Sequence, residues 1–171
     1  MLWPPEDPFN ELFWMVGYIV VRWGSIEQDM DGLITIVYNL PGGRELAQEK
    51  QLPRMFKRKV RFLKTAFSQL TLLQPYKQEM DRLLETLQAC ADIRHWLVHG
   101  AITGDYTELS FGYAKIEYGK DEYTLSTDEL LKEYFPILRD KFHDLLVESG
   151  NFLLKLSSEF PTRPRSPQRL H

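Results

Sequence analysis

Apolar residues recur at alternating spacings of four and three residues over the first part of the chain. This stripe consists of Leu12, Val16, Ile19, Trp23, Ile26, Met30, Leu33 and Val37. Such regularity is typical of a long amphipathic helix packed along most of its length. We expect the helix to run from about Pro8 to Leu40, with Asn10 or Asp7 as its cap and Pro41-Gly42-Gly43 as its stop.

The same periodicity predicts two further helices. The second opens near Pro53, after a loop, and its apolar positions are Phe56, Val60, Leu63, Phe67 and Leu70. The third runs from about Pro75 to His99-Gly100, where glycine is a usual terminator. Its apolar positions are Met80, Leu83, Leu84, Leu87, Ala91, Leu97 and Val98.

Residues 106–125 have a different pattern, rich in Tyr, Phe, Ile and Thr with partial alternation. We predict a β-hairpin here, with its turn at Gly119-Lys120-Asp121 and a bulge at Ala114-Lys115-Ile116. Residues 126–129 resemble a helix cap with acids in the first turn. The last helix would then reach about Phe160, with a bend or break near Pro136.

These elements predict a mostly α fold, an up-and-down bundle of four to five helices with a β-hairpin inserted before the last one. We expect one domain over residues 1–160, followed by a disordered, basic, proline-rich tail over 161–171. A chain of 171 residues is long enough to bury a hydrophobic core without disulfide bonds or structural metal ions.

Composition and charge exclude several classes of protein. The lone Cys90 rules out an internal disulfide framework, and no run of residues is long and apolar enough to span a bilayer. The acidic, proline-rich start does not resemble a secretory signal. We therefore expect a soluble, cytoplasmic protein without membrane contact. The net charge is −3, yet six basic residues and no acid lie between Arg54 and Lys64, either a solvated helix face or a phosphate-binding one.

Arg94 is the first candidate for chemistry, because it falls within the apolar arc of the third predicted helix. An unpaired buried guanidinium costs several kcal/mol, so Arg94 needs a carboxylate, a phosphate or a wet cleft. Asp92 and Glu27 are possible carboxylate partners. A structural ion pair and a phosphate site remain equally open at this point.

His95 and His99 follow one turn apart near the end of the same helix. His99 is suited to general acid–base work, although a histidine at a helix end also fits a simple C-terminal cap. The pair has the spacing of two metal ligands, but no third ligand is evident and Trp96 replaces the glutamate of the common zinc motif. We therefore expect neither a metal nor another cofactor.

The run Arg94-His95-Trp96-Leu97-Val98-His99-Gly100 resembles the R-(polar)-x-x-x-H signature of the HEPN superfamily of helical proteins. Trp23-Gly24-Ser25-Ile26-Glu27 is similar to the first helix of many HEPN-like proteins, and the basic stretch from Pro53 to Leu63 is similar to what often follows it. The resemblance covers roughly residues 10–100. His95 departs from the family, which most often has asparagine there.

The resemblance implies a metal-independent endoribonuclease, acting as a homodimer and serving as a toxin or defence effector. Arg94, His99 and His95 would be catalytic, while the proposed substrate-binding residues are Arg54, Lys57, Arg58, Arg61, Trp96 and Glu27. Trp96 would stack on a base or fill the dimer interface. The partners implied are RNA and an antitoxin or nucleotidyltransferase. The alternative is a catalytically silent HEPN-like module for dimerisation or for binding a nucleotide or partner.

Overall fold

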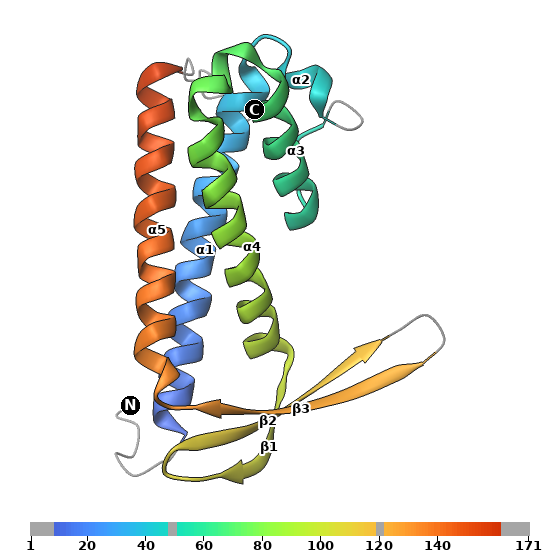
Figure 1. The fold of residues 1–171 in the computed structure, drawn as a ribbon, viewed down its shortest axis with the longest axis vertical. Helices are drawn as coiled ribbons and strands as arrows, with labels where there is room; N and C mark the ends of the chain where they lie inside the picture. The colour runs from blue at the N-terminus through green and yellow to red at the C-terminus, as the bar shows by residue number, and fades with distance from the viewer. Residues whose placement is uncertain (1–8, 48–50, 119–121, 162–171) are drawn as a thin grey trace, which may run out of the picture. The chain divides into compact units, whose positions relative to one another are not determined.

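A computed structural model describes residues 9–47, 51–118 and 122–161 (Figure 1). Within these residues the chain forms five α-helices and a small antiparallel sheet that precedes the last helix, which confirms the predicted fold class. The described residues gather into two compact units, one within 1–25 and 86–146 and the other within 26–85 and 147–171. The single domain over 1–160 stays a prediction, and the tail from 162 onward lies outside the described residues.

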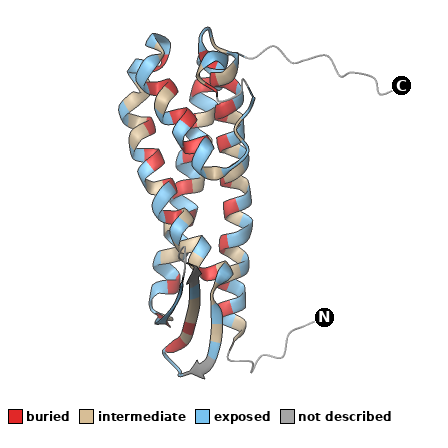
Figure 2. Ribbon diagram, turned by 90° about the vertical axis from the view of Figure 1, so that its right-hand side faces the viewer, coloured by how far each residue is buried: buried red, intermediate tan, exposed pale blue. Residues whose placement is uncertain are grey.

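The first unit combines the first half of helix α1 (Asn10–Asn39), the end of α4 (Lys77–His99), the sheet and the first half of α5 (Tyr134–Glu159). Buried residues alternate with exposed ones along each long helix (Figure 2), as the apolar periodicity predicts. Trp23 of α1 meets Phe142 of α5 edge to face, with ring centroids 6.4 Å apart. Cys90 of α4 is buried, and burial raises the pKa of its thiol.

The sheet has the order β1-β2-β3, with strands Ala101–Tyr106, Ser110–Tyr118 and Tyr123–Leu131 (Figure 1). Between β1 and β2 the Oγ1 of Thr107 accepts the backbone N–H groups of Leu109 and Ser110, at 3.1 and 3.0 Å. The predicted hairpin corresponds to β2 and β3, whose register runs from Ser110 opposite Leu131 to Tyr118 opposite Tyr123. The predicted turn residues, 119–121, lie outside the described residues.

The structure corrects three details of this region. Ser126-Thr127-Asp128-Glu129 do not cap a helix, because cross-strand pairing with β2 holds them in β3. The register of β2 against β3 is unbroken at 114–116, and the irregularity lies instead between β1 and β2, near Ile102 and Tyr106. Pro136 neither bends nor breaks α5, since it lies in the first turn, where a missing N–H costs nothing.

The second unit contains the end of α1, α2 (Gly43–Leu46), α3 (Phe56–Gln69), the 3₁₀ helix η2 (Thr71–Tyr76), the start of α4 and the end of α5. Phe67 of α3 contacts Phe152 of α5, with ring centroids 5.9 Å apart. Ser149 of α5 donates a hydrogen bond to Asp29 of α1, at 2.7 Å. No helix among the described residues has the length and apolar character that crossing a membrane requires.

Helix α2 occupies a stretch that the sequence predicts to be loop. The turn into α2 requires glycine at two consecutive positions, 42 and 43. Gly42 has a φ of 80°, a left-handed conformation that favours glycine, and a Cβ on Gly43 would lie 1.9 Å from the carbonyl oxygen of Val37. These two glycines therefore end α1 and bring α2 back beside its last turn.

Candidate active site

The end of α4 is fixed by close contact with strand β2. The N–H of Gly100 donates to the carbonyl of Trp96 at 2.9 Å, which closes the last turn of the helix. A Cβ on Gly100 would lie 2.1 Å from Cε1 of Tyr113, so only glycine allows this approach. Tyr113 donates its hydroxyl proton to the carbonyl of Leu97 and stacks on Trp96, with ring centroids 4.3 Å apart. Burial raises the pKa of Tyr113, which keeps this donor protonated.

Arg94 is half-buried on α4, one turn before the helix ends. Its Nε is buried and has no hydrogen-bond partner among the described residues. Leaving such a donor unsatisfied costs about 1–3 kcal/mol, more when the group is charged. None of the ion pairs found among the described residues includes Arg94. The described residues therefore leave this buried donor of Arg94 unsatisfied.

His95 and His99 are exposed and face one another, with ring centroids 4.6 Å apart and planes tilted by 48°. The pKa of His95 is lowered from its ordinary 6.5, first by desolvation and then by the positive charges of Lys115, His99 and Arg94. Asp92 acts in the opposite direction on this pKa. The lowered pKa leaves His95 mostly neutral at pH 7, so its ring can accept a proton.

Lys115 is a member of this site that the sequence pattern did not reveal. It lies on β2, two residues after Tyr113, so both side chains project from the same face of the strand. Its positive charge helps to lower the pKa of His95, and the strand face that it shares with Tyr113 is the one that packs against the end of α4. Alternation within the predicted hairpin could have placed it on that face, but not beside α4. We call Arg94, His95, His99 and Lys115 the α4 cluster.

Two other predicted site residues have different surroundings. Trp96 has one ring face covered by Tyr113, and it also lines a hollow of about 430 Å³ together with Asp128 and Glu129 of β3. Glu27 is half-buried on α1 and belongs to the second unit, whereas the α4 cluster belongs to the first. Within the described part of the chain, no group of three or more His, Cys, Asp or Glu side chains is arranged to hold a metal ion.

The predicted RNA-contacting residues lie on or next to α3, in the second unit. Arg54, Lys57, Arg58 and Arg61 are all exposed. Lys59 corrects the expectation of one continuous basic face, because it is buried and its Nζ lies 2.6 Å from Oδ1 of Asp31 on α1. The sequence could not separate this structural lysine from its exposed neighbours.

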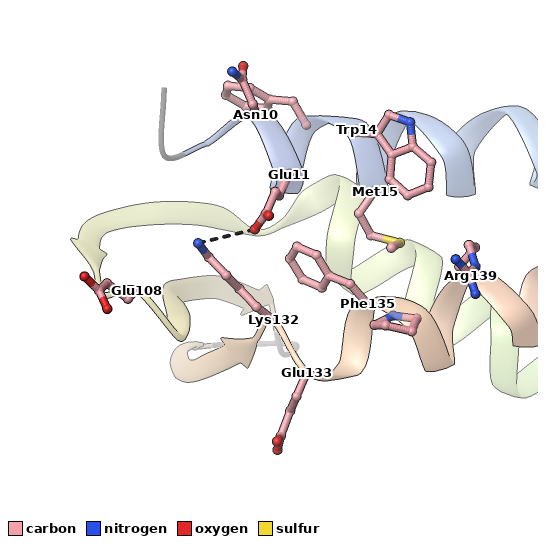
Figure 3. Close-up of a pocket in the computed structure, with 11 residues that line it drawn as sticks. Asn10, Glu11, Trp14, Met15, Glu108, Lys132, Glu133, Phe135 and Arg139 are labelled. Atoms are coloured by element: carbon pink, nitrogen blue, oxygen red, sulfur yellow. Dashed lines mark ion pairs between the residues drawn. The ribbon is translucent and has the colours of Figure 1, made fainter. Parts of the chain in front are cut away.

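A larger cleft, of about 1060 Å³, lies in the first unit between the start of α1 and the start of α5 (Figure 3). Its two cations already have partners. Lys132 lies 3.4 Å from Glu11 across the cleft, and Arg139 lies 2.8 Å from its neighbour Asp140. The rest of the wall is largely apolar, with Met15 and Phe135 facing the interior (Figure 3). The cleft therefore lacks the unpaired cation that distinguishes the α4 cluster.

The α4 cluster combines two permanent positive charges with two titratable rings on adjoining elements. Such a set can bind a phosphate, stabilise negative charge that grows on it and move protons to and from its oxygens. Comparison with known proteins finds no match to the chain among family models, curated proteins or solved structures.

Proposed function

We propose that the protein is a metal-independent endoribonuclease of the HEPN type that acts as a homodimer. The observation that carries the proposal is the buried Nε of Arg94, which has no partner among the described residues, on the helix that also carries the facing imidazoles of His95 and His99. A phosphodiester supplies the missing acceptor, and the histidines supply the proton transfers that its cleavage needs.

In the proposed reaction a 2′-hydroxyl of RNA attacks the adjacent phosphorus as the bond to the 5′-oxygen breaks. His95, whose pKa is lowered, accepts the proton of the 2′-hydroxyl. His99, when protonated, donates a proton to the departing 5′-oxygen. Arg94 and Lys115 stabilise the charge on the phosphate oxygens. The products are a 2′,3′-cyclic phosphate and a free 5′-hydroxyl, so atoms and protons balance without a metal ion.

A homodimer is part of the proposal because the α4 cluster is small and open. Both histidines are exposed, so one chain alone does not exclude water from the reacting phosphate. A two-fold axis near the end of α4 would bring two clusters around one RNA segment. A toxin or defence role, held in check by an antitoxin or nucleotidyltransferase, is the setting that the HEPN resemblance suggests.

The second candidate function is a catalytically silent module that binds RNA, a nucleotide or a partner protein. The specific observation in its favour is His95, which stands where the family most often has asparagine and whose ring contacts His99. Pairing with His95 could hold His99 in an orientation that binds phosphate without transferring a proton. The two candidates share a binding site and differ only in turnover.

RNA cleavage by the purified protein in excess EDTA tests the proposal. We expect the wild type to produce 2′,3′-cyclic phosphate ends, and His99→Ala and Arg94→Ala each to lower the rate about 100-fold or more. His143→Ala is a matched control, since His143 is an exposed histidine of α5 outside the cluster. Equal cleavage by all four proteins would indicate a contaminating nuclease and overturn the proposal. RNA binding without turnover, lost in the Arg94 variant, would establish the silent module.

A further inference from the structure

A groove beside α3 combines three arginines with apolar walls. Arg54, Arg58 and Arg61 line a hollow of about 550 Å³, and Leu52, Met55 and Phe62 contribute to its apolar surface. All of these residues belong to the second unit. We call this hollow the arginine groove.

Among the described residues, no carboxylate neutralises the arginines of this groove. None of the described residues that line it is acidic, and none of the ion pairs among the described residues includes Arg54, Arg58 or Arg61. The first turn of α3 adds to the excess, because it carries basic residues and no acid, and no side chain caps it. Cations at this end oppose the helix dipole, so an anion in the groove would relieve an unfavourable arrangement.

The kind of anion follows from the residue types. The exposed lysines of α3, Lys57 and Lys64, lie outside the groove, and each basic side chain among the described residues of its wall is an arginine. A guanidinium group can donate two parallel hydrogen bonds to two oxygens of one phosphate. Three guanidinium groups therefore match the charge and oxygens of a dianionic phosphate better than those of a single carboxylate. A phosphate group is therefore the best match for the charged wall.

The apolar wall indicates what accompanies the phosphate. Leu52 and Met55 are 47% and 68% exposed, so a ligand in the groove would remove apolar surface from water, which favours binding. A flat base next to a phosphate would cover both walls at once, since bases stack readily on apolar and guanidinium surfaces. The volume lies within the range of about 300–1000 Å³ that is usual for small-molecule sites.

We infer that the arginine groove binds a nucleotide, with its phosphate on Arg54, Arg58 and Arg61 and its base against Leu52 and Met55. The nucleotide is either free or part of a single strand. This inference does not depend on the nuclease proposal, because the groove and the α4 cluster share no residue.

Titration calorimetry on the full chain tests the inference. The probes are 5′-AMP, inorganic phosphate, single-stranded DNA of about eight nucleotides and an acidic peptide of glutamates. DNA lacks the 2′-hydroxyl that the proposed cleavage requires, so the result is independent of nuclease activity. We expect 5′-AMP to bind more tightly than inorganic phosphate. A strand that binds more tightly than 5′-AMP identifies nucleic acid as the source, and the reverse order identifies a free nucleotide.

Two double variants separate a shaped site from general positive charge. Arg58→Ala/Arg61→Ala removes two groove cations, and we expect about a tenfold or greater loss of affinity. Arg44→Ala/Lys64→Ala removes the same charge from exposed positions of the second unit outside the groove, and we expect less than a threefold change. Thermal melts of both variants confirm that each is folded. Equal losses in the two variants, equal binding of phosphate and 5′-AMP, or peptide binding that matches the DNA would each overturn the inference.

Discussion

The α4 cluster and the arginine groove are both positively charged, but they are built from different kinds of cation. Two of the four members of the α4 cluster are imidazoles, a side-chain type that can both accept and donate protons, whereas the described cations of the groove are guanidinium groups, which only donate hydrogen bonds. The cluster also holds a buried, unsatisfied donor on Arg94, while the groove arginines are exposed. The first region can therefore move protons and the second can only hold an anion.

The two regions also differ in how the fold supports them. The α4 cluster forms where a strand meets a helix end, so its geometry depends on the contact between Gly100 and Tyr113. The arginine groove depends on the position of α3. An ion pair between Lys59 of α3 and Asp31 of α1 stabilises that position. Different substitutions should therefore disturb one region and spare the other.

The largest expected effect is that of Gly100→Ala on the α4 cluster. The new methyl group would lie 2.1 Å from Cε1 and 2.5 Å from Cδ1 of Tyr113, so β2 must shift away from α4. We expect a loss of about 1–3 kcal/mol in the free energy of unfolding, as for other overpacked sites. Denaturant titration measures the loss, and the NMR shifts of the His95 ring report the displacement of Lys115.

Gly17→Ala is the control for this prediction, because nothing lies within 4 Å of the Cβ that it adds on α1. In a helix interior alanine is favoured over glycine by about 0.5–1 kcal/mol, so this variant should be more stable. Binding of 5′-AMP should be unchanged in folded Gly100→Ala. A stable Gly100→Ala with unaltered His95 shifts would contradict the proposed dependence on this contact.

Much of the fold could be predicted, because helices α1, α3 and α4 follow from local periodicity. The stripe from Leu12 to Val37 is buried at nearly every position, and α4 ends at His99 as Gly100 indicates. The errors lie where long-range pairing overrides local preference. Residues 126–129 resemble a helix cap, yet hydrogen bonds to β2 hold them in a strand.

The site was predicted only in part, for a related reason. Arg94, His95 and His99 lie on one helix, so their spacing alone brings them together. Lys115 comes from a strand, and its effect on the pKa of His95 depends on the packing of Tyr113 against the end of α4. Lys59 illustrates the converse, since nothing in a run of lysines and arginines marks the one that will be buried.

A smaller effect is expected from Lys59→Ala, which tests whether Lys59 has a structural role while the arginines of α3 bind the anion. Lys59 is buried, but its partner Asp31 is 58% exposed, so the pair lies between a surface and a buried salt bridge. We expect a loss of about 1–2 kcal/mol in the free energy of unfolding. Lys64→Ala, at an exposed position of α3, should change it by less than about 0.5 kcal/mol.

Binding of 5′-AMP sharpens this prediction when it is measured on both lysine variants below their melting temperatures. We expect affinities close to wild type, because neither lysine lines the arginine groove. If Lys59→Ala lost affinity as strongly as Arg58→Ala/Arg61→Ala while remaining as stable as wild type, Lys59 would be a binding residue. That result would contradict the structural role given to it here.

The smallest expected effect is the pH dependence contributed by His95. Its pKa is lowered in the folded protein relative to the unfolded chain, whose pKa is near 6.5, so the unfolded chain binds the proton more readily. The contribution of His95 to the free energy of unfolding is therefore greatest above pH 6.5, and it declines as the pH falls through the lower pKa of the folded state.

Lys115→Ala removes the main positive neighbour and should raise the pKa of His95, as an NMR titration of the ring would measure. Lys141→Ala, on α5, is the control with the same charge change, and it should leave that pKa unaltered. An equal rise in both variants would mean that Lys115 acts on His95 only through net charge, and it would then have no place in the α4 cluster.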